Sequence, residues 1–366
     1  MRVFKVPFDI KREEKIFGGY LSLRQVVYLM LGASSLSLFA TPLPIALKIL
    51  LIFFIISFLC MLIVKKIDYN LYKKHSNKIL LLSLILLILV LIPGIGTLRN
   101  GSRSWFKIGP FGLQPSEIAK VSLIIFLSKY LEKNQNNLSN ITKSILPVLG
   151  IIFLFFGLIM LEPDFGTGMV IVLSLMLILF ISGVKLKFFA SLGILGILGI
   201  AGLIIIAPYR LKRIISFLNP WSDPLGSGYQ IIQSLYAIGP ASLLGLGFGK
   251  SIQKQFYLPE PQTDFIFAII CEEFGIIGAM SVIVLFISLF YIILKISLKQ
   301  SNLFAKYLSF GLGMQIILQA TLNLCVVTSL IPVTGVTLPF FSYGGSSLLV
   351  SMMSIGIILN ICGNGK

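Results

Sequence analysis

The chain has 366 residues and a formal net charge of +17, from 30 Lys and Arg against 13 Asp and Glu. Hydrophobic residues make up 57% of it, charged residues only 12%, and the mean hydropathy is +0.98, which excludes an ordinary soluble domain. The basic excess invites a nucleic-acid interpretation, but the cations stand between apolar runs, where positive-inside bias and anionic lipid headgroups explain them. We therefore expect a multi-pass membrane protein that binds no nucleic acid.

Apolar runs of about 18 to 25 residues, the length that crosses a bilayer, recur along the chain. They predict an all-α fold of about ten transmembrane helices, at residues 25–41, 45–64, 79–97, 117–131, 144–161, 166–184, 188–208, 265–294, 305–331 and 345–362. Clusters of Lys and Arg on alternate sides of these helices place both termini in the cytosol. The expected units are a cytosolic tail at 1–24, a transmembrane domain at 25–362 and a cytosolic end at 363–366. A large extracytoplasmic loop, about 209–264, is expected between helices 7 and 8.

Two segments expected outside the membrane carry cations against the charge rule. They are residues 97–109 and 208–264, with Arg99, Arg103, Lys107, Arg210, Lys212, Arg213, Lys250 and Lys254. Cations kept on the unfavoured face indicate an anionic ligand there, although long loops cross the membrane regardless of their charge.

Eight of the 13 acids also fall in outer segments or near the outer ends of helices: Glu117, Glu162, Asp164, Asp223, Glu260, Asp264, Glu272 and Glu273. Carboxylates beside apolar helices are costly and tend to mark functional sites or partnered polar networks. Asp264 stands where a polar loop meets an apolar run, and its alternative role is a simple helix N-cap. Glu117 and Lys120 are three residues apart on one helix face, which predicts an ion pair that is either structural or part of a ligand site.

Histidine and cysteine usage argues against several other kinds of site. The four cysteines stand singly, without CxxC spacing, so neither a disulfide framework nor a structural zinc site is expected. The single histidine, His75, lies in the basic stretch "LYKKHSNK", which argues against a Ser-His-Asp triad. No cluster of metal ligands is evident.

Five long stretches resemble a known family: "LIPGIGTLRNGSRSWFKIGPFGLQPSEIAK", "EPDFGTG", "APYRLKRIISFLNPWSDPLGSGYQIIQSLYAIGP", "QKQFYLPEPQTDFIFAIICEEFG" and "LIPVTGVTLPFFSYGGSSL". They occur in family order between residues 91 and 348. The chain is similar to the SEDS proteins (shape, elongation, division and sporulation), and closest to the sporulation and division branch. It departs from that family in its first two helices. It also has Gln262 where many relatives have His, so a mechanism in which that His assists the base does not apply here.

The resemblance implies a peptidoglycan glycosyltransferase that polymerises lipid II at the outer membrane face. The implied reaction is an inverting transfer, in which the 4-hydroxyl of an acceptor N-acetylglucosamine attacks C1 of the lipid-linked N-acetylmuramic acid and undecaprenyl pyrophosphate leaves. One base suffices because the leaving group has a low pKa. Asp264 matches the family's essential acid and is expected to be this base.

Cations are expected to stabilise the departing pyrophosphate. The candidates are Arg103, Lys120, Arg210 and Arg213, with Glu117 orienting Lys120. Trp105 either lines the sugar or lipid path or anchors a helix at the interface. No metal site or cofactor is evident, although a pyrophosphate substrate could bring Mg²⁺ or Mn²⁺ with it. The partner implied is a class B penicillin-binding protein, a single-pass transpeptidase.

Two rival functions are a lipid II flippase without transfer chemistry and a scaffold that docks another membrane protein. A flippase should need charges along a translocation path across the membrane, whereas these acids and cations are expected at the outer ends of the membrane helices. A scaffold should keep its function when Asp264 is replaced by Ala. The polymerase is favoured over both.

Overall fold

The computed structural model describes residues 15–16, 21–22, 45–99, 102–108, 111–138, 140–206, 215–255 and 257–364. The first expected membrane helix, at 25–41, lies outside these residues, as do Arg210 and Arg213. The helices of the described part are α2 (Ile45–Val64), α3 (Tyr69–Leu91), α4 (Pro115–Asn134), α5 (Leu146–Leu161), α6 (Phe165–Ile181), α7 (Leu186–Ile206), α9 (Tyr229–Ile238), α10 (Ile266–Leu298), α11 (Leu303–Val327) and α12 (Gly345–Asn364).

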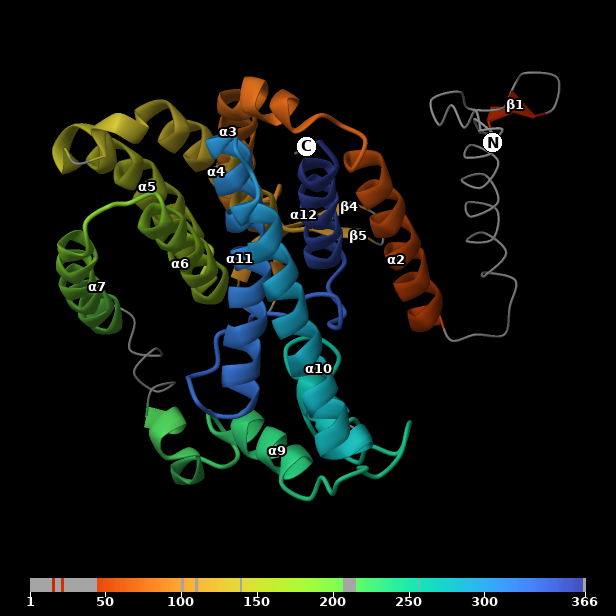
Figure 1. The fold of residues 1–366 in the computed structure, drawn as a ribbon. Helices are drawn as coiled ribbons and strands as arrows, with labels where there is room; N and C mark the ends of the chain where they lie inside the picture. Colours follow the sequence, from red (N-terminus) through yellow and green to blue (C-terminus); the bar gives the residue numbers. More distant parts are fainter. Residues whose placement is uncertain are drawn as a thin grey trace.

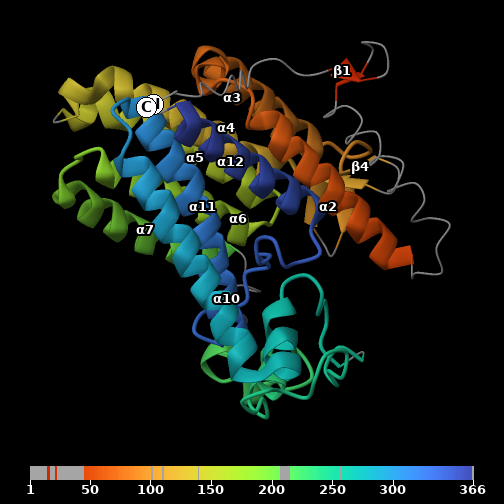
Figure 2. The same ribbon diagram turned by 45° about the vertical axis from the view of Figure 1, so that its right-hand side comes forward.

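Five stretches within the described residues are long and apolar enough to cross a membrane: Tyr69–Leu91, Ile141–Leu161, Ile266–Leu298, Leu303–Val327 and Gly345–Gly363. A polytopic helical membrane protein is therefore confirmed. The total of ten spans stays a prediction. Figures 1 and 2 show α10 and α11 running side by side, with α9 across one end of the pair.

Helix α3 differs most from the expected segment, 79–97. It begins ten residues earlier because the Asp68 side chain caps it, accepting a hydrogen bond of 3.0 Å from the Asn70 amide. It ends at Leu91 because Pro93 cannot continue the hydrogen-bond ladder and Gly94 turns the chain with a φ of 92°. The polar residues of its first turns thus belong to the helix.

Residues of the segment 97–109, which is expected outside the membrane, form a small antiparallel sheet together with residues 111–113. Strand β3 (Thr97–Arg99) pairs with β4 (Ser102–Ile108), and β4 pairs with β5 (Phe111–Leu113) in the register Lys107↔Gly112. A two-residue pair, β1 (Lys15–Ile16) with β2 (Leu21–Ser22), lies apart from it in the sequence. The expected all-α class therefore holds, and the three-stranded sheet is a short addition to it that leads directly into α4.

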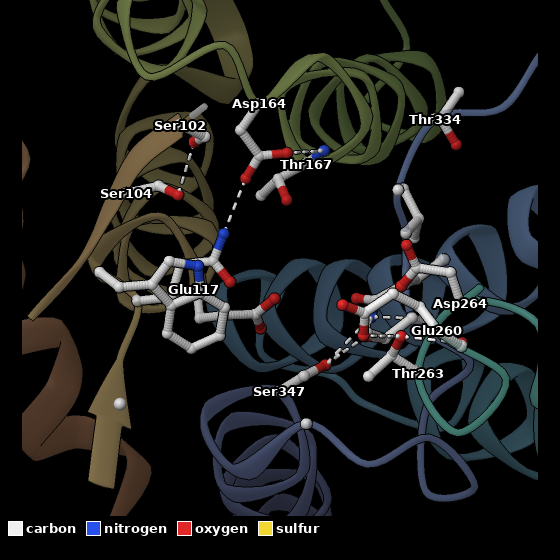
Figure 3. A pocket seen from close by; sticks show the side chains of 18 of the residues that line it. Ser102, Ser104, Glu117, Asp164, Thr167, Glu260, Thr263, Asp264, Thr334 and Ser347 are labelled. Atoms are coloured by element: carbon white, nitrogen blue, oxygen red, sulfur yellow. Dashed lines mark hydrogen bonds between the residues drawn. The ribbon is translucent and has the colours of Figure 1, made fainter. Parts of the chain in front are cut away.

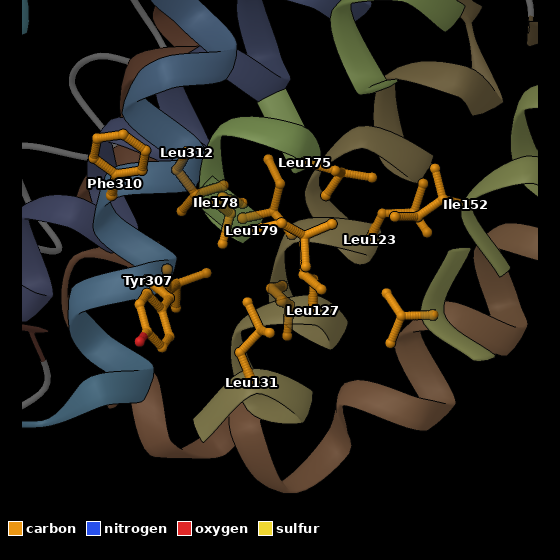
Figure 4. Packing of buried hydrophobic residues seen from close by; sticks show 14 of the residues in the cluster. Leu123, Leu127, Leu131, Ile152, Leu175, Ile178, Leu179, Tyr307, Phe310 and Leu312 are labelled. Atoms are coloured by element: carbon orange, nitrogen blue, oxygen red, sulfur yellow. The ribbon is translucent and has the colours of Figure 1, made fainter. Parts of the chain in front are cut away.

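Helix α4 forms the centre of the largest apolar cluster. Leu123, Leu127 and Leu131 project from it at roughly one-turn spacing and are almost fully buried. They belong to one cluster with Ile178 of α6 and Leu308 of α11, as Figure 4 shows for the leucines of α4 and residues of α6 and α11. This packing fixes α4, α6 and α11 relative to one another, and the polar side chains that these helices carry lie toward their opposite ends.

Helix α10 is interrupted at Gly275, whose φ of 63° and ψ of −157° are not helical. The segment 242–247 lies in this break: the amide of Ile276 donates to the Ser242 carbonyl at 3.2 Å, and the amide of Leu246 donates to the Glu272 carbonyl at 2.9 Å. A Cβ atom on Gly275 would lie 2.2 Å from the Ser242 carbonyl oxygen, so only glycine fits. The break at Gly275 therefore joins residues 242–247 to α10.

Candidate functional site

A cavity of about 600 Å³ lies where α4, α6, α9, α11, α12 and strand β4 meet the segment before α10. Its lining combines polar and apolar side chains, and Figure 3 shows many of the polar ones converging on one space. The polar lining residues are Ser102, Ser104, Gln114, Glu117, Lys120, Asp164, Thr167, Gln230, Glu260, Thr263, Asp264, Gln319, Thr334, Thr337, Tyr343 and Ser347.

Asp264 stands on one wall of this cavity, beside Glu260 and Thr263 (Figure 3). Helix α10 begins at Ile266 and its N-cap is Phe265, so the alternative interpretation of Asp264 as the N-cap is wrong. The Asp264 carboxylate faces the segment 333–337, because a Cβ atom on Gly335 would lie 3.8 Å from its Oδ2. Asp264 is thus a loop carboxylate that reaches the cavity.

Glu117 and Lys120 form the predicted ion pair, with 2.9 Å between the Lys120 Nζ and the Glu117 Oε1. Their side chains are only 5% and 2% exposed. The Lys120 ammonium also donates to the Gln319 Oε1 at 2.7 Å, so two of its three hydrogens are used within the described residues. The Glu117 Oε2 is buried and has no hydrogen-bond partner there. Both groups retain hydrogen-bonding capacity at the edge of the cavity.

Asp164 faces the cavity from the turn between α5 and α6. Its Oδ2 accepts a hydrogen bond from the Gln114 Nε2 at 2.8 Å, and its Oδ1 accepts one from the Thr167 amide at 3.1 Å. Burial raises the pKa of Asp164, while the hydrogen bonds from Thr167 act in the opposite direction. Behind it, burial and then the charge of Asp164 raise the pKa of Glu162 to about 9, so Glu162 is neutral at pH 7.

The structure brings together four of the seven predicted site residues: Asp264, Lys120, Glu117 and Trp105 all line the cavity. Arg103 does not line it, and its buried Nε has no hydrogen-bond partner among the described residues. Arg210 and Arg213 lie outside those residues. Within the described parts of the chain, no group of three His, Cys, Asp or Glu residues is placed to hold a metal ion.

The adjacent acids Glu272 and Glu273 bind residues 249–254 and do not line the cavity. Glu273 accepts hydrogen bonds from the amides of Gly249 and Ser251 and forms an ion pair of 2.6 Å with Lys254. Glu272 accepts from the Ser251 hydroxyl and from the amide of Ile252. Both carboxylates therefore tie residues 249–254 to α10.

Sequence reasoning missed several polar residues of the cavity, notably Gln114, Asp164 and Gln319. Asp164 belongs to "EPDFGTG" and is one of the acids expected near the outer face, but the sequence assigns it no role. Gln319 is a nearly fully buried amide in an apolar helix, a placement that is costly without a partner. This cost is a sign in the sequence that Gln319 has a polar partner. The sequence does not identify the partner, because Lys120 is 199 residues away from Gln319 along the chain.

Three kinds of comparison relate the chain to known proteins. The family described as "Cell cycle protein" (FTSW_RODA_SPOVE) matches residues 19–366. The chain is 48% identical to stage V sporulation protein E of Bacillus subtilis over 85% of each chain. It is 40% identical to a probable peptidoglycan glycosyltransferase FtsW of Trichlorobacter lovleyi, over 86% of this chain and 83% of that one.

Solved structures have the same fold. A chain from a peptidoglycan synthase complex, described as coordinating polymerization and crosslinking, aligns with a TM-score of 0.73 at 28% identity, over 93% of this chain and 96% of that one. The rod shape determining protein RodA of Thermus thermophilus aligns with a TM-score of 0.63 at 26% identity, over 93% of this chain and 94% of that one.

Proposed function

The chain belongs to the FtsW, RodA and SpoVE family of cell cycle proteins, and from this premise we propose that it is a peptidoglycan glycosyltransferase that polymerises lipid II. The family predicted from the motifs between residues 91 and 348 is thereby confirmed. The observation that carries the proposed chemistry is that a loop carboxylate, Asp264, and a buried ammonium, Lys120, line the same cavity.

Asp264 is the general base of this proposal. Glycosyl transfer to a sugar hydroxyl requires a group that takes the hydroxyl proton as the new bond forms. The 4-hydroxyl oxygen of the acceptor attacks C1 of the donor N-acetylmuramic acid, the bond from C1 to the pyrophosphate oxygen breaks, and the proton passes to Asp264. The configuration at C1 inverts because a single displacement occurs, and undecaprenyl pyrophosphate carries away the electron pair.

Lys120 is the proposed contact for the departing pyrophosphate. An ammonium held by two oxygen acceptors and excluded from bulk water is preorganised for negative charge that develops on the leaving group. Glu117 and Gln319 supply these acceptors and fix the position of the Nζ atom.

The described lining of the cavity contains four carboxylates, Glu117, Asp164, Glu260 and Asp264, against the single ammonium of Lys120. A pyrophosphate needs more positive charge than this, so we assign Arg210 and Arg213 to the same group of contacts. Arg103, which does not line the cavity although its neighbours Ser102 and Ser104 do, is retained as a weaker candidate. Trp105 is assigned to the sugar or lipid path because its side chain lines the cavity.

The finer topology is part of the same proposal. We place ten spans in the cytoplasmic membrane with both termini in the cytosol, and the loop at about 209–264 on the outer face. Helix α9 supports a position of this loop at a membrane interface, because its buried residues Ile231, Ile232 and Ala237 face the protein while Tyr236 and the nearby Trp221 are exposed. Aromatic side chains of this kind favour the membrane interface.

A class B penicillin-binding protein is the proposed partner. The support is the likeness to a chain of a peptidoglycan synthase complex, in which polymerization is coordinated with crosslinking. The alternative function, a lipid II flippase without transfer chemistry, has in its favour only that a polar cavity could also carry a lipid headgroup. A carboxylate on a cavity wall suits proton transfer better than the passage of an anion.

The test separates the two functions. The chain, purified with its transpeptidase partner, is incubated with lipid II as wild type, as Asp264→Asn and as Asp223→Asn. The last variant is the control, because the Asp223 carboxylate accepts a hydrogen bond from the Ser227 amide and does not line the cavity. We expect glycan strands from the wild type and from Asp223→Asn but none from Asp264→Asn. If labelled lipid II crosses vesicle membranes but none of the three proteins forms strands, the flippase is the function that remains.

A further inference from the structure

Three successive main-chain carbonyls at the base of the proposed site are each held from outside their own segment. The carbonyl of Gln262 accepts a hydrogen bond from the Tyr343 amide at 2.7 Å, and that of Thr263 accepts one from the Ser342 hydroxyl at 2.5 Å. The carbonyl of Asp264 accepts one from the Asn323 Nδ2 at 2.7 Å. The backbone that carries Asp264 is thus fixed by α11 and by the segment before α12.

Asn323 differs from the other two donors because it also holds the facing segment. Its Nδ2 donates a second hydrogen bond, of 2.7 Å, to the Val336 carbonyl. Residues 333–337 line the cavity, and Gly335 stands opposite the Asp264 carboxylate. One side-chain amide therefore connects the segment that bears the base to the segment that faces it.

The orientation of the amide follows from these two acceptors. Both carbonyls require a donor, so the nitrogen must point toward them and the Oδ1 away. The Oδ1 is buried without a hydrogen-bond partner among the described residues, and the whole residue is only 1% exposed. An unpaired buried oxygen costs stability, so an amide at this place is expensive unless its two donors are needed.

We infer that Asn323 is a positioning residue that sets the distance between the Asp264 carboxylate and the substrate hydroxyl. The inference rests on the proposed function, in which Asp264 is the base. Asn323 does not line the cavity; it acts by joining the carbonyls of Asp264 and Val336. Loss of the amide would free both carbonyls and allow the two segments to separate, while Lys120 would keep its own contacts.

The separation of roles along α11 makes the inference specific. Gln319 lies one turn before Asn323 on the same helix face, and its Oε1 binds Lys120 while its Nε2 binds Thr337 and Ser347. Gln319 thus supports the cation and Asn323 supports the base. Substitution of Asn323 should therefore reduce the rate of transfer without reducing the binding of lipid II.

The experiment compares Asn323→Leu with Gln315→Leu in the complete chain with its partner. Gln315 is a suitable control because it lies two turns earlier on α11, is equally buried at 1% exposure, and does not line the cavity. Binding is measured as the affinity and stoichiometry of lipid II in detergent or nanodiscs, and transfer as the turnover number at saturating lipid II. Asn323→Asp is included because a protonated carboxyl keeps one of the two donors.

We expect the turnover of Asn323→Leu to fall by roughly 10- to 100-fold, the effect of a displacement of about 1 Å, with unchanged stoichiometry and affinity for lipid II. Asn323→Asp should lie between it and the wild type, and Gln315→Leu should match the wild type. A turnover of Asn323→Leu within about twofold of the wild type would overturn the inference, as would binding that falls in proportion to turnover.

If Asn323→Leu does not fold, Asn323→Asp decides: reduced turnover with intact binding supports the positioning role, and full turnover overturns it. The proposed function fails separately, if the wild type and Asp264→Asn both give no strands.

Discussion

The buried pair of Glu117 and Lys120 allows a structural role to be separated from a role in substrate binding. Replacing Lys120 by Met would leave the Glu117 carboxylate buried, at 5% exposure, without its ionic partner. Removing one member of a buried ion pair costs about 3–5 kcal/mol of unfolding free energy. It would also leave the Gln319 Oε1 without its donor, which adds about 1–3 kcal/mol.

The double variant Glu117→Leu/Lys120→Met removes both charges together. Replacing a buried ion pair by apolar side chains of similar size is often neutral or stabilising. Only the Gln319 oxygen then remains unpaired, so we expect most of the stability lost in Lys120→Met to return. The coupling between the two positions should therefore be on the order of 3 kcal/mol.

The assay has two parts, unfolding in a detergent titration and strand formation from lipid II. If Lys120 contacts the pyrophosphate, the double variant should be stable yet inactive. Recovery of both stability and strand formation would refute the substrate role and leave a structural ion pair. Equal stability of Lys120→Met and the wild type would refute the premise that this pair is dry and tightly coupled.

Three further predictions concern other parts of the fold. Between pH 4.5 and about 9 the native chain holds a proton on Glu162 that the unfolded chain releases, so stability should fall as pH rises through this range. The fall, measured by Tm at several pH values, should be less steep in Glu162→Gln. An identical slope of Tm against pH in both proteins would contradict the raised pKa of Glu162. Gly166→Ala would place a Cβ atom 2.4 Å from the side chain of Val336, so it should lower the Tm and strand formation, whereas Gly157→Ala, with open space around it, should leave both unchanged. Glu273→Gln should weaken the attachment of residues 249–254 to α10, which faster amide hydrogen exchange in that segment would detect; unaltered exchange would count against the anchoring role.

The helices could be predicted from the sequence to the extent that the membrane determines them. Helix α2 spans Ile45–Val64, as expected, because a continuous apolar run in lipid has to satisfy its own backbone hydrogen bonds. The start of helix α3 was predicted ten residues too late, because a hydropathy pattern does not reveal the N-cap at Asp68. The sheet β3–β4–β5 was missed because its strands are short and have no sustained alternation of apolar and polar residues.

The candidate site could be predicted only where a local cost indicated it. Asp264 and the Glu117–Lys120 pair were found because charges beside apolar helices are expensive. Gln319 and Asn323 were missed because their partners lie on other helices and loops, and a sequence without contacts does not supply these pairings. Glu272 and Glu273 are carboxylates beside an apolar helix, as Asp264 is, and the sequence gives them the same indication of a site. The structure instead pairs them with residues 249–254.

The most direct test of the account is a single-turnover measurement on lipid II bound to the wild type and to Asp264→Asn, with occupancy measured in the same samples. We predict that Asp264→Asn binds lipid II fully and forms the glycosidic bond slower by about 10²–10⁴-fold, since a positioned base contributes that much to the rate. A rate for Asp264→Asn within about threefold of the wild type at equal occupancy would contradict the assignment of Asp264 as the base.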